Sequence, residues 1–150
     1  MDRKILAVLC NKDVAGELQE LSFGVGDSHQ KGKTVGLIRC EGGQIVYKPR
    51  SLKVDAVLFD FIKELVENHS TLSTIRIPRV VALADHGWAE FVDHQHAIGD
   101  EELSKFYQGI GHWLAIMRLL GGCDFHAENM IAHRSSPVIV DCETLFTTKN

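Results

Sequence analysis

Four polar residues near the C-terminal end of the chain have the types and spacing of a phosphoryl-transfer site. Asp124, His126 and Asn129 lie close together, and Asp141 directly follows the apolar run 138–140. In protein kinases one aspartate accepts the proton of the attacking hydroxyl, while an asparagine and a second aspartate bind the metal ions. The pattern therefore predicts Asp124 beside a substrate hydroxyl, with Asn129 and Asp141 as magnesium ligands.

His126 lies between these residues, where it would stabilise charge on the transferring phosphoryl group. An ordinary loop between a helix and a strand has similar residue types and is the simpler interpretation. Asp141 argues against it, because a carboxylate that follows a buried strand usually has a partner, and hard cations prefer such oxygens.

A lysine and a glycine-containing segment earlier in the chain would complete a nucleotide site. Gly24 and Gly26 lie in a stretch typical of loops, and Lys48 ends an apolar strand pattern. A lysine on a strand beneath such a loop neutralises nucleotide phosphates, and in kinases a helix glutamate holds it. Glu64 or Glu67, on the expected helix that follows, would take that role, and the sequence does not distinguish between them.

Two other phosphate-site interpretations fit less well. The string at 32–34 (GKT) invites a Walker A interpretation, but its distance from Gly26 is one residue too long and a hairpin pattern follows where a helix is needed. Asp27 and His29 form a second acid–imidazole pair, which also begins many metallophosphoesterase sites. The Gly-Asn-His element of those sites is missing from the sequence.

Length, charge and cysteine usage exclude several classes of protein. The chain has 150 residues, enough for one compact domain, and a formal net charge of −4, which does not favour nucleic acid as a partner. We expect no membrane span and no secretory signal, since the apolar stretch at the N-terminus is short. The cysteines form no C-x-x-C pair, which favours free thiols in a cytoplasmic protein: Cys10, Cys40, Cys123 and Cys142.

The hydrophobic patterns predict an α+β fold. Helices are expected at 13–20, 52–68 and 100–120, and strands at 34–39, 44–48, 79–83, 87–92 and 138–140. Strand 79–83 is expected to be buried.

The helix ends also have sequence signals. Ser51 and Asp100 are the expected N-caps, and Gly121 ends the long helix. That helix has a broad apolar face with Phe106 and Trp113, whose expected exposure predicts self-association or a partner subunit.

Several strings of residues resemble the dehydratase domain of class II (LanM-type) lanthipeptide synthetases. They are GDSH at 26–29, VYKPRSL at 46–52, HGW at 86–88, GGCDFHAEN at 121–129 and DCETLF at 141–146. The likeness extends over about residues 24–146, and the strings YKPRSL and DxETLF are unusual.

The resemblance implies a core similar to protein and lipid kinases. Such a domain uses ATP and Mg²⁺ to phosphorylate Ser and Thr in a precursor peptide, and then eliminates phosphate to leave dehydroalanine or dehydrobutyrine. It further implies the roles of residues that match the family's motifs. Lys48 would contact ATP and Asp141 would bind metal, the catalytic loop would contain Asp124, His126 and Asn129, and elimination would use Asp27 and His29.

The expected architecture is a kinase-like N-lobe at about 22–92, with an antiparallel sheet and a helix, joined to the start of a C-lobe at about 100–150. The sequence ends at Asn150. An arginine and a threonine that the family uses in elimination, the rest of the C-lobe and the zinc-dependent cyclase domain are therefore expected to be absent. Because phosphorylation does not require those two residues, we expect this chain to retain phosphorylation activity more readily than elimination activity.

Two alternatives remain open at this stage. One is a truncated, inactive module that binds a nucleotide or a complementary subunit, and the other is a small-molecule phosphotransferase. The expected partners are a Ser/Thr-containing precursor peptide and either another subunit or a second copy of the chain.

Overall fold

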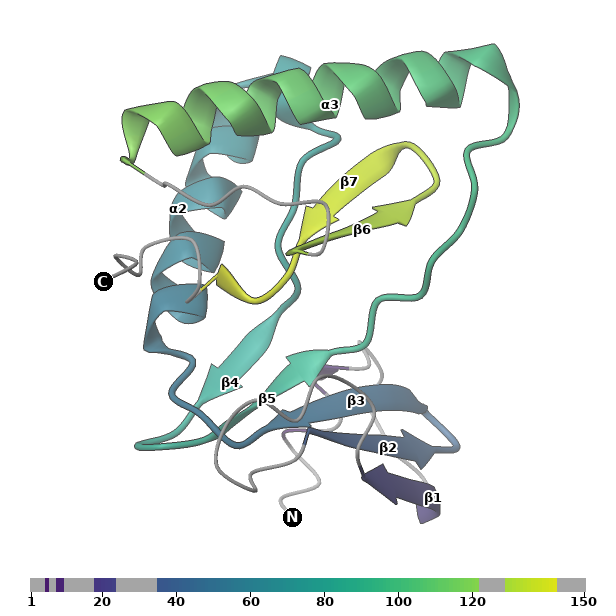
Figure 1. Ribbon diagram of the computed structural model, residues 1–150, viewed down its shortest axis with the longest axis vertical. Helices are drawn as coiled ribbons and strands as arrows, with labels where there is room; N and C mark the ends of the chain where they lie inside the picture. The colour runs from purple at the N-terminus through teal and green to yellow at the C-terminus, as the bar shows by residue number, and fades with distance from the viewer. Residues whose placement is uncertain (1–4, 6–7, 10–17, 24–34, 122–128, 143–150) are drawn as a thin grey trace. The chain divides into compact units, whose positions relative to one another are not determined.

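The structure is a computed structural model that describes residues 5, 8–9, 18–23, 35–121 and 129–142 (Figure 1). It divides into two compact units. The first comprises Met1–Ala56 and Arg79–Phe91, and the second comprises Val57–Pro78 and Val92–Asn150. The architecture is α+β, while the expected kinase-like lobes and their boundaries stay a prediction.

The first unit contains a five-stranded antiparallel sheet. Its spatial order is β1 (Leu18–Phe23), β2 (Gly36–Cys40), β3 (Gly43–Lys48), β5 (Gly87–Glu90) and β4 (Val80–Ala82). A short turn joins β2 to β3, with Cys40 paired to Gly43, which confirms the expected hairpin. The strands expected at 79–83 and 87–92 are also present.

Two expectations about these strands are wrong. The helix expected at 13–20 fails at its C-terminal end, because β1 begins at Leu18 and pairs with β2; residues 13–17 lie outside the described part of the chain. Backbone pairing with a neighbouring strand here overrides local helical preference. Strand β4 is half-buried rather than buried, because it lies at the edge of the sheet.

Alternation along β3 places Lys48 on the face of the sheet opposite the first unit's core. The core contains Ile38, Cys40 and Ile45, with Trp88 packed against it. Tyr47 belongs to this face, and its ring centroid lies 5.0 Å from that of Trp88. Since successive side chains of a strand point to opposite faces, Lys48 lies on the other face.

A close contact fixes the chain as it leaves β3. Lys48 pairs with Gly87 across the sheet, and Leu52, which is 1% exposed, packs against Gly87. A Cβ at residue 87 would lie 2.5 Å from Leu52 Cδ1 and 2.7 Å from the Val81 carbonyl oxygen. Only glycine therefore leaves room for Leu52 at this point.

Helix α2 (Lys53–Asn68) confirms the helix expected at 52–68. Its first intrahelical acceptor is the Leu52 carbonyl oxygen, which binds the Ala56 N–H at 2.9 Å. Ser51 thus lies one residue before the cap position, and its hydroxyl accepts only a 3.4 Å hydrogen bond from the Lys53 N–H. Helix α2 begins in the first unit and continues into the second.

The second unit packs α3 (Gly99–Leu119), a 3-10 turn η1 (Ser70–Leu72) and a two-stranded hairpin around one core. The hairpin strands are β6 (Met130–His133) and β7 (Ser136–Ile139), and Figure 1 shows them alongside α3. The core cluster draws on α2, α3 and β7: Leu58, Ile62, Ile75, Ile77, Trp113, Ile116, Met117, Ile139 and Cys142.

The ends of α3 differ partly from expectation. Gly121 has a φ of +71° and follows the last turn, as expected of a helix C-terminus. At the other end the N-cap is Ile98 rather than Asp100. The Glu102 carboxylate accepts the Ile98 N–H at 2.8 Å and so caps the helix from inside its first turns.

The expected exposure of Trp113 is wrong. Its side chain is 0% exposed, and its indole N–H donates a 2.7 Å hydrogen bond to the Pro137 carbonyl oxygen. Phe106 is half-buried. Helix α3 still exposes Leu103, Tyr107 and Leu114, so self-association through this helix stays a prediction.

Two glycines of α3 provide a matched test of this packing. At Gly109 a Cβ would lie 2.8 Å from the Pro137 ring and 2.9 Å from Thr74 Oγ1, whereas at Gly111 nothing lies within 4 Å. We expect Gly109→Ala to lower the free energy of unfolding by about 1–3 kcal/mol through overpacking. Gly111→Ala should raise it by about 0.5–1 kcal/mol, because alanine favours a helix over glycine. Urea unfolding measures both, and equal effects of the two substitutions would contradict the close packing of α3 on β7.

Candidate functional site

The β6–β7 hairpin brings together two of the expected metal ligands. Its strands pair from Met130–Ile139 at the base to His133–Ser136 at the tip. One step below the base, the Val140 N–H donates a 2.7 Å hydrogen bond to the Asn129 carbonyl oxygen. Asp141 is the next residue, so Asn129 and Asp141 leave the same end of the hairpin although they lie far apart in sequence. Strand β6 was not expected from the sequence, and this meeting was therefore missed.

Asp141 has a left-handed backbone conformation. Its φ is +54°, one of two positive values among the described residues other than glycine. Aspartate adopts this region more readily than most residues, although it still has a cost that surrounding structure must offset. A left-handed residue cannot continue a strand, so the chain changes direction at the residue expected to bind metal.

Buried neighbours hold Asp141 on both sides along the chain. Val138, Ile139 and Cys142 are each 0% exposed, whereas Asp141 is half-buried. The contacts of Trp113 and Gly109 with Pro137 fix the other end of β7. A carboxylate between anchored residues has little freedom to move, which suits a ligand that must be preorganised.

Both edges of the hairpin are also paired with neighbouring backbone. On the β7 side, the Ile139 N–H donates to the Arg76 carbonyl oxygen at 3.4 Å. On the β6 side, the Gln95 N–H donates to the Ala132 carbonyl oxygen and the Arg134 N–H donates to the Gln95 carbonyl oxygen, each at 2.9 Å. These bonds oppose a slip in strand register.

An ion pair fixes the tip of the hairpin. Arg134, in the turn, has a φ of +56°. Its Nη2 lies 2.6 Å from Glu102 Oε1, and its Nε donates to Glu102 Oε2 at 3.3 Å. Hydrogen bonds from the Ile98 N–H and then from Arg134 lower the pKa of Glu102 below its ordinary value of 4.5.

The two other described site residues lie on separate elements. Lys48 is the half-buried last residue of β3. Glu64 is exposed on α2, where it borders a shallow depression of about 310 Å³ with Phe61, Asn68 and His69. Glu67 is exposed as well. The pairing of either glutamate with Lys48 stays a prediction.

The remaining expected site residues lie outside the described part of the chain. They are Gly24, Gly26, Asp27, His29, Asp124 and His126. Their roles therefore stay predictions. The described residues Gly121 and Asn129 bracket the segment that contains Asp124 and His126.

The residue types at the hairpin base fit magnesium. No three His, Cys, Asp or Glu side chains gather as a metal cluster within the ranges that the structure describes. Asn129 offers one amide oxygen, and Asp141 offers one carboxylate group. Magnesium is commonly held by one or two carboxylates, with substrate phosphates and water completing its shell. This donor set suits a metal that arrives with a nucleotide.

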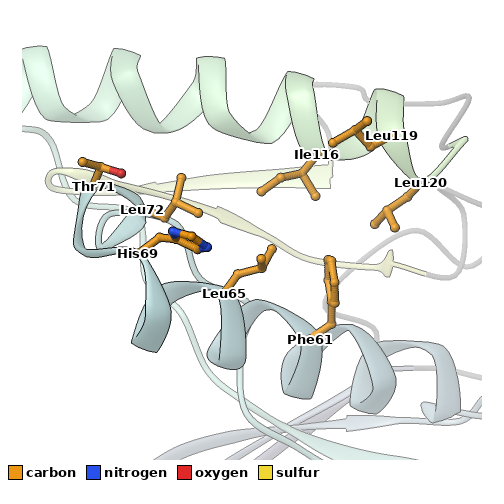
Figure 2. A pocket seen from close by; sticks show the side chains of 8 residues that line it. All are labelled: Phe61, Leu65, His69, Thr71, Leu72, Ile116, Leu119 and Leu120. Atoms are coloured by element: carbon orange, nitrogen blue, oxygen red, sulfur yellow. The ribbon is translucent and has the colours of Figure 1, made fainter.

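A separate apolar groove lies between α2 and α3 in the second unit (Figure 2). It has a volume of about 370 Å³ and is lined by Phe61, Leu65, His69, Thr71, Leu72, Ile116, Leu119 and Leu120. None of these is an expected site residue, and the lining holds no carboxylate or ammonium group. We assign no phosphate chemistry to this groove.

The helices that the structure describes include none that is both long and apolar enough to cross a membrane.

Comparison with known proteins gives the family. Residues 1–150 match the family model described as "Domain of unknown function (DUF4135)". The chain belongs to this family. A relative from Lactococcus lactis subsp. lactis, the "Lacticin 481/lactococcin biosynthesis protein LcnDR2", is 32% identical over 128 residues. The match covers 81% of this chain and 14% of that relative's length. These two matches confirm the resemblance to class II lanthipeptide synthetases.

The Glu102 cap makes the stability of the second unit depend on pH. Because folding lowers the pKa of Glu102, the charged carboxylate stabilises the fold above its ordinary pKa, and this contribution is lost as pH falls through the lowered value. We expect Glu102→Gln to lower Tm at neutral pH, and to lower it by less at about pH 3.

Arg134→Gln should keep part of this pH dependence, because the hydrogen bond from the Ile98 N–H, the largest single cause of the shift, remains. Differential scanning calorimetry across this pH range tests both variants. An equal loss of Tm at both pH values in Glu102→Gln would contradict the assigned role.

Proposed function

We propose that this chain binds Mg-ATP and transfers its γ-phosphoryl group to Ser and Thr of a precursor peptide in lanthipeptide biosynthesis. The observation that carries the proposal is the hairpin base, where Asn129 and Asp141 emerge together and Asp141 turns the chain. Family membership and a relative described as a lacticin 481 biosynthesis protein support the choice of substrate.

Each residue of the proposed site has a chemical role. Asn129 and Asp141 hold magnesium, which when bound neutralises charge on the nucleotide phosphates. Lys48 contacts the phosphates through its ammonium group. We assign Gly24 and Gly26 to the close approach of backbone to the phosphates, and Glu64 or Glu67 to orienting Lys48.

The transfer step needs a group that accepts a proton. Asp124 takes the proton of the peptide hydroxyl as its oxygen bonds to the γ-phosphorus, and the bond from that phosphorus to the ADP oxygen breaks. His126 stabilises charge on the phosphoryl group during transfer. We assign Asp27 and His29 to any later elimination, in which the proton on Cα of the phosphorylated residue is removed, the Cβ–O bond to phosphate breaks, and an alkene remains in the peptide.

Nucleotide binding can be measured without turnover. At a hundredfold excess of Mg-ATP over Kd, ligand binding should stabilise the fold by about 2.7 kcal/mol. Lys48→Ala and Asp141→Asn should each remove most of that stabilisation in a thermal-shift assay. Asparagine tolerates the left-handed conformation at residue 141, so the second change removes charge with little backbone strain.

Matched controls are Lys105→Ala and Asp93→Asn, which alter an exposed lysine and an exposed aspartate of the second unit. Both should keep the full response to Mg-ATP. A wild-type response to Mg-ATP in Lys48→Ala or in Asp141→Asn would contradict the proposed role of that residue.

Turnover requires a peptide substrate and a mass measurement. We expect a Ser/Thr-containing precursor peptide with its leader to gain phosphate when incubated with the chain and Mg-ATP. Asp124→Asn should abolish that gain and keep nucleotide binding, since Asp124 acts on the hydroxyl. A loss of water from the peptide would indicate that elimination follows. An unchanged peptide mass despite bound nucleotide would reject the kinase activity in favour of a binding module.

A further inference from the structure

A buried ion pair lies close to Lys48 along the chain, and the proposed site gives it no role. Asp55 is the only charged residue among the buried ones that the structure describes, with 5% exposure. Arg50 Nη1 donates to Asp55 Oδ2 at 3.0 Å, and Nη2 donates to Oδ1 at 3.5 Å. The side chains of Arg50 and Asp55 are 15% and 7% exposed. The guanidinium therefore contacts both carboxylate oxygens away from water.

Stability alone does not account for this pair. Removing two charges from water costs several kcal/mol, and replacing a buried ion pair with apolar residues is often neutral or stabilising. What such a pair supplies is direction, because a planar guanidinium meets a carboxylate in a fixed, two-pronged geometry. The location of the pair then decides which part of the molecule is oriented.

The pair joins the end of β3 to the start of α2. Arg50 comes two residues after Lys48, and Asp55 lies in the first turn of α2. A carboxylate there is favoured by the helix dipole. Arg50 Nη1 also donates to the Ser51 carbonyl oxygen at 3.1 Å, so the guanidinium binds the connecting backbone as well.

A second anchor closes the same segment onto the sheet. Leu52 packs against Gly87, the residue that pairs with Lys48 across the sheet. The connection from Lys48 to Leu52 is therefore fixed at its start by the β3–β5 ladder, in its middle by Arg50 and at its end by Leu52. All of these residues belong to the first unit.

We propose that Arg50 and Asp55 are positioning residues that set the direction of Lys48 toward nucleotide phosphates. The inference rests on the proposed function for the identity of the ligand. Neither residue contacts the nucleotide in this proposal. The pair instead fixes the angle at which the chain leaves β3, directly after the residue that carries the ammonium group.

A double variant separates positioning from stability. In Arg50→Met/Asp55→Leu both charges are replaced together by apolar side chains of similar size. We expect the urea midpoint to stay close to that of the wild type. The Kd for Mg-ATP should rise by about tenfold or more, the size of loss seen when a group that orients a metal ligand is removed. The KM for the precursor peptide should not change.

Conservative single variants keep the proposal testable if the double variant does not fold. Arg50→Lys keeps the positive charge but cannot donate two parallel hydrogen bonds to the carboxylate. Asp55→Asn keeps one acceptor oxygen but loses the negative charge. Each should weaken Mg-ATP binding more than it lowers the urea midpoint. Glu101→Gln breaks the exposed Glu101–Lys105 pair of α3 and is the control; it should leave Mg-ATP binding unchanged.

A measurement without nucleotide distinguishes failure of this inference from failure of the proposed function. Lysines labelled with ¹³C-methyl groups give separate NMR signals, and the Lys48 signal is assigned by its loss in Lys48→Arg. That signal should shift in the Arg50 and Asp55 variants and not in Glu101→Gln. If the wild type does not bind Mg-ATP but the Lys48 signal still shifts in the Arg50 and Asp55 variants, the ligand is rejected and the positioning role is kept. A folded variant with an unmoved Lys48 signal and wild-type Mg-ATP affinity would overturn it.

Discussion

Backbone pairing between β6 and β7 is the constraint on which the candidate site depends. Asn129 precedes the first strand of this hairpin and Asp141 follows the second. Only the strand register places both residues at the end of the hairpin opposite its turn. A slip by one residue would turn every side chain of a strand to the other face. The buried residues of β7 and the neighbouring backbone at Arg76 and Gln95 oppose such a slip. The backbone positions of the two expected ligands thus follow from packing remote from them.

The first unit holds the ammonium group of Lys48 in a similar way. Lys48 ends β3, and the segment after it is fixed by Leu52 against Gly87 and by Arg50 against Asp55. Each unit therefore supplies its chemical groups from the end of a strand whose following residues are anchored. Loops at strand ends that a rigid scaffold positions are where functional residues concentrate.

Sequence reasoning succeeded where a pattern was long and regular. The β2–β3 hairpin, α2 and α3 were all predicted close to their observed limits. It failed where an element was short or its partner was distant. Strand β6 has four residues and no alternation of polar and apolar side chains. Its turn has Arg134 at positive φ, without the Asn-Gly or Gly signal of a hairpin. Contacts with Gln95 and Glu102 hold that turn, and a pattern of neighbouring residues in the sequence does not predict such distant contacts.

From the sequence by itself came the chemical groups, the main periodicities and the family, because residue type and spacing along a strand or helix are local properties. The tertiary structure alone decided that Asn129 and Asp141 leave the same end of the β6–β7 hairpin. It also decided that Trp113 is buried against Pro137 and that Arg50 and Asp55 pair away from water. Each of these depends on which segments pack together. Spacing along the chain does not specify that choice, because the burial and backbone hydrogen bonding of the whole fold determine it.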